Sequence, residues 1–177
     1  MESDEELMAA VARGDERALG ALVDRHAARL HAHLVRVCGS RDDADDLLQE
    51  TWVRVARGAR TYRPGRPLRP WLYGIATHLA ADLRRRRAVR ARAAAEGVHE
   101  PDPPAWGEAG EGALERLALR ERIALLPPRL REVVELRYWA GLDEAEMAEA
   151  LGIPRGTVKS RLHAALRVLK GGEEERS

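Results

Sequence analysis

Three carboxylates in the first half of the chain, Asp43, Asp46 and Glu50, are spaced three and four residues apart. On a helix this spacing places them on one face, with Gln49 at its edge. Paired carboxylates can act in general acid–base catalysis or bind a metal ion. No histidine joins this face, so we favour a docking face for a basic protein surface or a face that is simply solvated. Asp42 or Asp43 is expected to cap the helix.

Aromatic residues precede a dense run of arginines in the segment WLYGIATHLAADLRRRRAVR, which begins at Trp71. Aromatic rings can stack on unpaired bases while arginines neutralise phosphates, so the segment is suited to holding single-stranded nucleic acid. Two alternatives stay open: Trp71 and Tyr73 can belong to a core, and the arginines can solvate a helix end. The cationic candidates are Arg84, Arg85 and Arg86.

The most specific pattern lies near the C-terminus, where residues 143–170 predict a helix-turn-helix. Asp143 followed by Glu146 is a variant capping box at the start of the first helix. Gly152 permits a tight turn with positive φ, and Pro154 suits the first turn of the second helix. The second helix has a predicted buried stripe that consists of Val158, Leu162, Leu166 and Leu169.

The opposite face of that second helix is polar and basic. Arginine and lysine can bind guanine O6 and N7 or a phosphate, and serine and histidine can donate or accept. A basic second helix in this motif is the element that enters a DNA major groove, although a helical hairpin with a solvated basic face has the same pattern. The candidates for DNA contact are Arg155, Thr157, Lys159, Ser160, Arg161 and His163.

The elements that must position these residues are all predicted to be helical. Apolar residues recur at steps of three and four across residues 4–87, interrupted at Gly39–Ser40 and by the proline-rich segment TYRPGRPLRP. The same periodicity returns over residues 113–170. No segment shows strand-like alternation. With no phenylalanine and 4% aromatic residues, we expect the cores to be built from Leu, Val, Ile and Ala.

Residues 93–112 separate the two helical segments. They contain three prolines, four glycines, five acids and no base, a composition that favours a flexible linker. Trp106 in this segment contacts either its own chain or a partner. We therefore expect an all-α chain of two small helical domains, residues 1–92 and residues 113–177, joined by this linker.

The overall composition excludes several classes of protein. The 177 residues carry a net charge of +1 and include one cysteine, Cys38, so no internal disulfide is expected. One thiol and six scattered histidines form no recognisable zinc set. No stretch is long and apolar enough for a transmembrane helix, and no signal sequence is present. We expect a cytoplasmic protein without a metal or cofactor. Its net charge is close to zero because separate acidic and basic segments cancel one another.

Three segments resemble bacterial sigma factors of the sigma-70 family, in the extracytoplasmic-function (ECF) group. The sequence DDADDLLQETWVRV is similar to the polymerase-binding helix of region 2. The sequence RPWLYGIATHLAADLRRRRAVR is similar to the segment that recognises and melts the −10 promoter element. Region 4, which reads the −35 element, is similar to LPPRLREVVELRYWAGLDEAEMAEALGIPRGTVKSRLHAAL. The resemblance covers nearly the whole chain.

The resemblance implies a sigma factor that directs core RNA polymerase to promoter DNA and assists promoter opening, without catalysis or a cofactor. The residues facing the clamp helices of the polymerase β′ subunit would be Asp43, Asp46, Gln49 and Glu50. The −10 strand would be held by the loop 63–69 and by Trp71, His78, Arg84, Arg85 and Arg86. The basic face of the last helix would lie in the −35 major groove, and region 4 would bind the β flap. An anti-sigma factor would cover these surfaces.

Three positions depart from the family pattern. His78 stands where many members have an asparagine that contacts a flipped −10 base, so either His78 takes over that contact or the base preference differs. Ala164 stands where many members have an arginine, and Glu144 replaces a more usual tyrosine or threonine.

Two other classes of protein are alternatives to a sigma factor. One is a helix-turn-helix repressor whose N-terminal half senses a ligand and dimerises, which the acidic face and the arginine run fit poorly. The other is an enzyme that uses the carboxylates of residues 42–50, for which the sequence offers no histidine partner.

Overall fold

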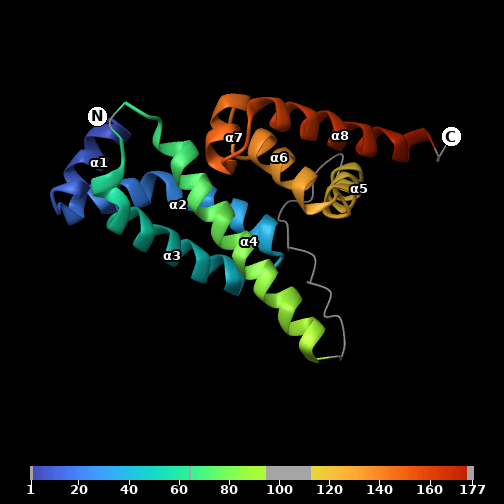
Figure 1. The fold of residues 1–177 in the computed structure, drawn as a ribbon, viewed down its shortest axis with the longest axis horizontal. Helices are drawn as coiled ribbons and strands as arrows, with labels where there is room; N and C mark the ends of the chain where they lie inside the picture. The colour runs from blue at the N-terminus through green and yellow to red at the C-terminus, as the bar shows by residue number, and fades with distance from the viewer. Residues whose placement is uncertain (1, 64, 95–112, 175–177) are drawn as a thin grey trace. The chain divides into compact units, whose positions relative to one another are not determined.

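The computed structural model describes residues 2–63, 65–94 and 113–174, and every regular element within them is a helix (Figure 1). The all-α prediction is therefore confirmed. The chain divides into two compact units, the first built on residues 1–104 and 149–152 and the second on residues 105–148 and 153–177. Most of the predicted linker, together with Trp106, lies outside the described residues. Within the described part of the chain, no helix has the length and apolarity needed to cross a membrane.

The first unit is a bundle in which α2 contacts α1, α3 and α4. Its core is built mainly from Leu, Val and Ala side chains, with Trp52 and Tyr73 as its buried aromatic residues among those that the structure describes. The C-terminal part of α4 extends beyond the other helices of the unit, and its residues 85–92 are exposed (Figure 1). The elements are α1 (Asp4–Ala12), α2 (Glu16–Cys38), α3 (Arg41–Gly58), the 3-10 turn η1 (Ala59–Thr61) and α4 (Leu68–Ala94).

The chain breaks between α1 and α2, which we did not predict from the helical periodicity. Gly14 adopts a left-handed φ of 94°, a conformation that glycine reaches without a steric penalty. Asp15 then caps α2, because its side chain accepts hydrogen bonds from the backbone N–H groups of Arg17 and Ala18. A glycine followed by a capping residue can thus end one helix and begin the next without interrupting the apolar periodicity.

The predicted cap of α3 was wrong. Ser40 caps this helix, because its hydroxyl accepts from the backbone N–H of Asp43 at 3.3 Å. Gly39 ends α2 with a φ of 72°, which leaves the chain extended at Ser40 in the geometry that a capping residue requires. Asp42 and Asp43 fall instead in the first turn of α3, where carboxylates favour the positive end of the helix dipole.

The second unit contains α5 (Ala113–Ala124), α6 (Pro128–Tyr138), α8 (Arg155–Glu174) and residues 144–148 of α7 (Glu144–Leu151). Helix α8 packs against α6 and α5 around a core that includes Ala165. The predicted stripe was wrong at one position, since Leu166 is 38% exposed whereas Ala165 is fully buried. Steps of four, three and four residues join Val158, Leu162, Ala165 and Leu169, and residues at these steps lie on one side of a helix. Ala165, and not Leu166, therefore lies on the side of α8 that contacts α6 and α5.

His33 is a titratable group in the core of the first unit. Its ring is fully buried, lies edge-on against Tyr73 at 5.2 Å, and has Nε2 3.4 Å from the Thr77 hydroxyl. Its Nδ1 atom has no hydrogen-bond partner among the described residues. Burial lowers the pKa of His33 to about 3, and the cationic Arg36 and Arg84 add to the effect.

We expect His33 to make the fold sensitive to acid. Because its pKa in the folded state is below the ordinary value of 6.5, the neutral ring favours folding above pH 6.5, and this contribution is lost as the pH falls from 6.5 toward 3. Because one ring takes up one proton, the free energy of unfolding falls by at most about 1.4 kcal/mol per pH unit in this range. Denaturant unfolding of the full chain at several pH values should therefore give a shallower acid-side slope for His33→Leu than for the wild type. Parallel slopes would contradict this assignment.

Candidate nucleic-acid and protein interfaces

The acidic face of α3 is only partly available to a partner. Asp46 and Gln49 are exposed. Glu50 accepts a hydrogen bond from Arg54 Nε at 2.9 Å, one turn along the same helix. Val53 is 41% exposed and follows Glu50 by three residues, so an apolar side chain continues this face. We did not predict Val53, although the same three- and four-residue spacing identifies it.

Asp43 differs from the other members of the acidic set. Its side chain is only 14% exposed, and its Oδ1 atom accepts from Nη2 of Arg87 on α4 at 2.6 Å. The ion pair joins the start of α3 to the arginine run of α4. Asp43 therefore holds two helices of the first unit together, and its carboxylate is less accessible than that of Asp46.

Trp71 lies near the start of α4 and is half-buried. Its ring packs against the ring of Tyr62 with centroids 5.3 Å apart. It also packs against Gly58, where an added Cβ would come within 3.2 Å of Trp71 Cζ2. Tyr73 is 3% exposed and belongs to the core. Of the two aromatic residues, only Trp71 therefore keeps surface that a base can contact.

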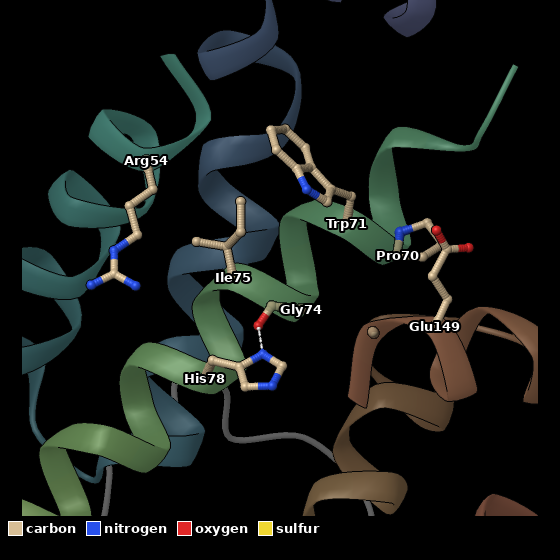
Figure 2. A pocket seen from close by; sticks show the side chains of 8 residues that line it. Arg54, Pro70, Trp71, Gly74, Ile75, His78 and Glu149 are labelled. Atoms are coloured by element: carbon tan, nitrogen blue, oxygen red, sulfur yellow. Dashed lines mark hydrogen bonds between the residues drawn. The ribbon is translucent and has the colours of Figure 1, made fainter. Parts of the chain in front are cut away.

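His78 follows Trp71 by two turns of α4 and is exposed. Its Nδ1 atom lies 2.6 Å from the Gly74 carbonyl oxygen, and Figure 2 shows the ring turned back toward that carbonyl. A carbonyl only accepts, so Nδ1 carries the proton of this hydrogen bond. In the neutral ring Nε2 is then an acceptor. The backbone of α4 thus determines the hydrogen-bonding character of the outer nitrogen.

The arginine run of α4 is partly neutralised within its own helix. Arg85 forms an ion pair with Asp82, and Arg86 Nε donates to the Asp82 backbone carbonyl at 3.4 Å. The hydrogen bond from Arg85 holds the pKa of Asp82 below its ordinary value. Arg84 is half-buried, whereas Arg85 and Arg86 are exposed. The exposed cationic surface is therefore concentrated toward the C-terminal end of α4.

The helix-turn-helix forms as the sequence predicts. Asp143 N–H donates to Glu146 Oε2 at 2.8 Å, and Asp143 Oδ1 accepts from the N–H groups of Ala145 and Glu146. The two hydrogen bonds that Oδ1 accepts, from Glu146 N–H and then Ala145 N–H, hold the pKa of Asp143 below its ordinary value. Gly152 has a φ of 63° at the turn between α7 and α8. The capping box and the turn glycine therefore fix where each helix begins and ends.

The outward face of α8 contains a shallow hollow. Three of the predicted DNA contacts line it, whereas Thr157 and Arg161 are half-buried at the edge of this face. Arg167 also lines the hollow and was not among the predicted contacts, although it follows His163 by four residues. The full lining is Gly156, Lys159, Ser160, His163, Ala164 and Arg167.

Arg155 is the first residue of α8 and lies outside that lining. Its Nε atom is 3.3 Å from Oε2 of Glu144, the first residue of α7. Glu144 therefore contacts a predicted DNA-binding residue, and Ala164 is part of the lining of the hollow.

The remaining titratable groups give no sign of a metal centre or a reactive thiol. Among the described side chains, no group of three or more His, Cys, Asp and Glu residues could hold a metal ion. Cys38 is buried, and burial raises the pKa of its thiol to about 11. A thiol protonated at neutral pH is a poor nucleophile.

Two family models match the chain, one in each unit. The model described as Sigma-70 region 2 matches residues 22–90, and the model described as Sigma-70, region 4 matches residues 116–169. The first match contains α3 and almost all of α4 up to Arg90, and the second contains α6, α7 and most of α8.

Curated proteins similar to the chain are ECF RNA polymerase sigma factors. SigL of Mycobacterium tuberculosis is 35% identical over 153 residues, covering 85% of this chain and 85% of SigL. SigE of Mycolicibacterium smegmatis is 36% identical, covering 95% of this chain and 68% of SigE. SigW of Bacillus subtilis is 31% identical, covering 90% of this chain and 91% of SigW.

Two solved structures have a similar fold. CnrH, solved in complex with the cytosolic domain of CnrY, superposes with a TM-score of 0.74 at 28% identity and covers 99% of this chain and 100% of that one. The sigma factor RpoE of Bartonella quintana, solved with the anti-sigma factor NepR, gives a TM-score of 0.70 at 25% identity and covers 80% and 88%.

Proposed function

We propose, because this chain belongs to the ECF group of sigma-70 RNA polymerase sigma factors, that each of its three candidate surfaces serves a separate step of promoter recognition. The chain directs core RNA polymerase to promoters in transcription initiation. The observation that carries this function is the presence of region 2 and region 4, in that order, in a single chain. Residues 1–92, 93–112 and 113–177 serve as the region 2 domain, the linker and the region 4 domain.

The polymerase-facing surface of this proposal is the outward side of α3. Asp46 and Gln49 are exposed there, which supports direct contact with a basic surface of the β′ clamp helices. Glu50 belongs to the same polymerase-facing surface, with its carboxylate paired to Arg54. Asp43 contributes by holding Arg87 as well as by facing the partner.

The −10 surface is formed by the loop 63–69 and the exposed side of α4. Trp71 supplies an aromatic ring for stacking, and His78 supplies a hydrogen-bonding edge two turns later. Arg84, Arg85 and Arg86 neutralise the phosphates of the melted strand. The half-buried position of Trp71 supports this role, because its contact with Tyr62 fixes the ring before a base arrives.

The −35 surface is the outward face of α8. Lys159, Ser160 and His163 line its hollow and reach base edges or phosphates in the major groove. Arg155 approaches from the start of the helix, where recognition helices contact bases. Thr157 and Arg161 reach the DNA from the edge of the face. Region 4 also binds the β flap.

The same surfaces suit control by an anti-sigma factor. RpoE of Bartonella quintana was solved with such a partner, and a protein that covers α3 or α8 would block polymerase or promoter binding. We place this chain in the cytoplasm, where its polymerase acts, and assign it no catalytic reaction.

In vitro transcription with core polymerase tests the function as a whole. We expect promoter-specific transcripts from a genomic fragment library only when the chain is added to core polymerase. A repressor or an enzyme would yield no such transcript, and that result would overturn the proposal. The triple variant Arg155→Ala/Lys159→Ala/His163→Ala provides the control, because it changes only exposed side chains of α8 and should still bind polymerase but lose transcripts that depend on the −35 element.

His78→Asn should change which base is preferred at a position of the −10 element. With Nδ1 bonded to the Gly74 carbonyl, the His78 ring presents one nitrogen, Nε2, to a base, whereas an asparagine amide offers both a donor and an acceptor. Transcription from promoters that differ singly across the −10 element measures the preference. His163→Asn, the same change on α8, should leave it unaltered. If His78→Asn gives the wild-type preference, His78 has a structural role.

A further inference from the structure

Glu144 and Arg155 form an ion pair between the first residue of α7 and the first residue of α8. The Arg155 side chain is 69% exposed and the Glu144 side chain is 33% exposed, so the pair lies at the surface of the helix-turn-helix. Glu144 also lies in the first turn of α7, where the helix dipole favours a carboxylate. Neither the −35 surface nor the other surfaces proposed above include Glu144, so its contact with Arg155 has no assigned role.

The geometry of the pair leaves most of the guanidinium available. An arginine has five N–H donors, and the carboxylate of Glu144 contacts Arg155 at Nε, 3.3 Å away. Within the described part of the chain, no acceptor is bonded to the four N–H groups on Nη1 and Nη2. A carboxylate that holds Nε restrains the plane of the guanidinium while its two terminal nitrogens stay accessible.

We propose that Glu144 is a positioning residue that orients Arg155 to read a guanine in the −35 element. The inference rests on the proposed function, in which α8 enters the major groove. Two terminal nitrogens in one plane match guanine O6 and N7, which is the commonest specific contact of arginine with DNA. The first residues of a recognition helix are those that reach base edges. A guanidinium restrained at Nε enters this contact with less conformational freedom to lose.

A phosphate contact by Arg155 fits the same geometry less well. Glu144 brings a negative charge beside the arginine, and Asp143 and Glu146 add two more at the start of α7. These carboxylates repel a phosphate that approaches the same place. The charge that orients Arg155 therefore weakens binding to DNA of arbitrary sequence. Glu144 thus has opposite effects on specific and non-specific binding.

This opposition gives the test. The holoenzyme is allowed to select promoters from a library randomised in the −35 region, and fluorescence anisotropy measures binding of the full chain to a duplex of random sequence. We expect the wild type to select guanine at one −35 position and Arg155→Ala to lose that preference. Glu144→Ala should reduce it by about tenfold while binding to the random duplex becomes tighter.

Two further variants separate positioning from simple charge removal. Glu144→Gln keeps an oxygen that accepts from Arg155 Nε, so it should retain most of the guanine preference. Glu149→Ala removes another carboxylate from the same helix, in its last turn, and it should leave the guanine preference unchanged. Replacing the selected guanine by 7-deazaguanine, which lacks the N7 acceptor, should weaken wild-type binding but not binding by Arg155→Ala.

The outcomes distinguish the inference from the function on which it rests. A wild-type guanine preference that persists in Glu144→Ala would overturn the positioning role and leave the proposed function intact. Equal losses of specific and random-duplex binding in Glu144→Ala would also overturn it, because the positioning role requires opposite changes in the two kinds of binding. A wild-type holoenzyme that selects no base in the −35 region would overturn the −35 function itself.

Discussion

Reversing the charge of Asp46 and Glu50 together should weaken binding of the chain to core RNA polymerase by about a hundredfold. Asp46 is exposed on α3, and Glu50 is one turn further along the same face. Arginines at these positions would meet a basic partner surface with like charge, and such juxtaposition costs several kcal/mol. Affinity of Asp46→Arg/Glu50→Arg for core polymerase, measured by fluorescence anisotropy of a labelled chain, tests this expectation.

The helices of this variant should remain folded. Neither substitution touches the α3 core, which is built on Ala44, Leu47 and Val55. The lost Glu50–Arg54 pair at the surface is worth only about 0.3–0.5 kcal/mol. The matched control is Glu16→Arg/Asp24→Arg, which makes the same change in net charge at exposed positions of α2. Equal affinities for the two double variants would rule out a docking role for the α3 face.

Removing the Lys159 side chain should reduce transcription from −35-dependent promoters by about tenfold to a hundredfold. Lys159 lines the hollow on the outward face of α8, and a good base contact is worth about 1–3 kcal/mol. Run-off transcription by Lys159→Ala holoenzyme, compared on promoters with and without a −35 element, measures the effect. The loss should be confined to promoters that depend on the −35 element.

Arg161→Ala is the matched control for Lys159→Ala. Both changes remove a cation from α8, but Arg161 is half-buried at the edge of the DNA-facing side. We therefore expect the smaller loss from Arg161→Ala. A loss from Lys159→Ala that is the same for every −35 base, with a reduced salt dependence, would identify Lys159 as a phosphate contact. A larger loss from Arg161→Ala would mean that the edge with Arg161, and not the hollow, lies closest to the DNA.

Much of the helical architecture was predictable from local sequence. The capping box of Asp143 and Glu146 and the turn at Gly152 depend on residues within a few positions of one another. The errors arose where several local choices were possible. Ser40, and not Asp42 or Asp43, caps α3 because Gly39 leaves the chain extended at Ser40.

The residues of the candidate sites could be predicted from the sequence, but the exposure of each side chain could not. Helical periodicity predicted Leu166 in the buried stripe of α8, but packing against α5 and α6 buries the neighbouring Ala165 instead. Periodicity likewise placed Asp43 and Asp46 on one face. Only the packing of α4 beside α3 brought Arg87 to Asp43 and left Asp46 exposed.

The sequence by itself determined the helical class, the order of the two regions and the side of α8 that is basic. These properties follow from residue types and from steps of three and four along one helix. The tertiary structure alone decided which charged residues form ion pairs with one another, as in the Asp43–Arg87 and Glu144–Arg155 pairs. The physical reason is distance along the chain, because partners 44 and 11 residues apart meet only when separate helices pack together.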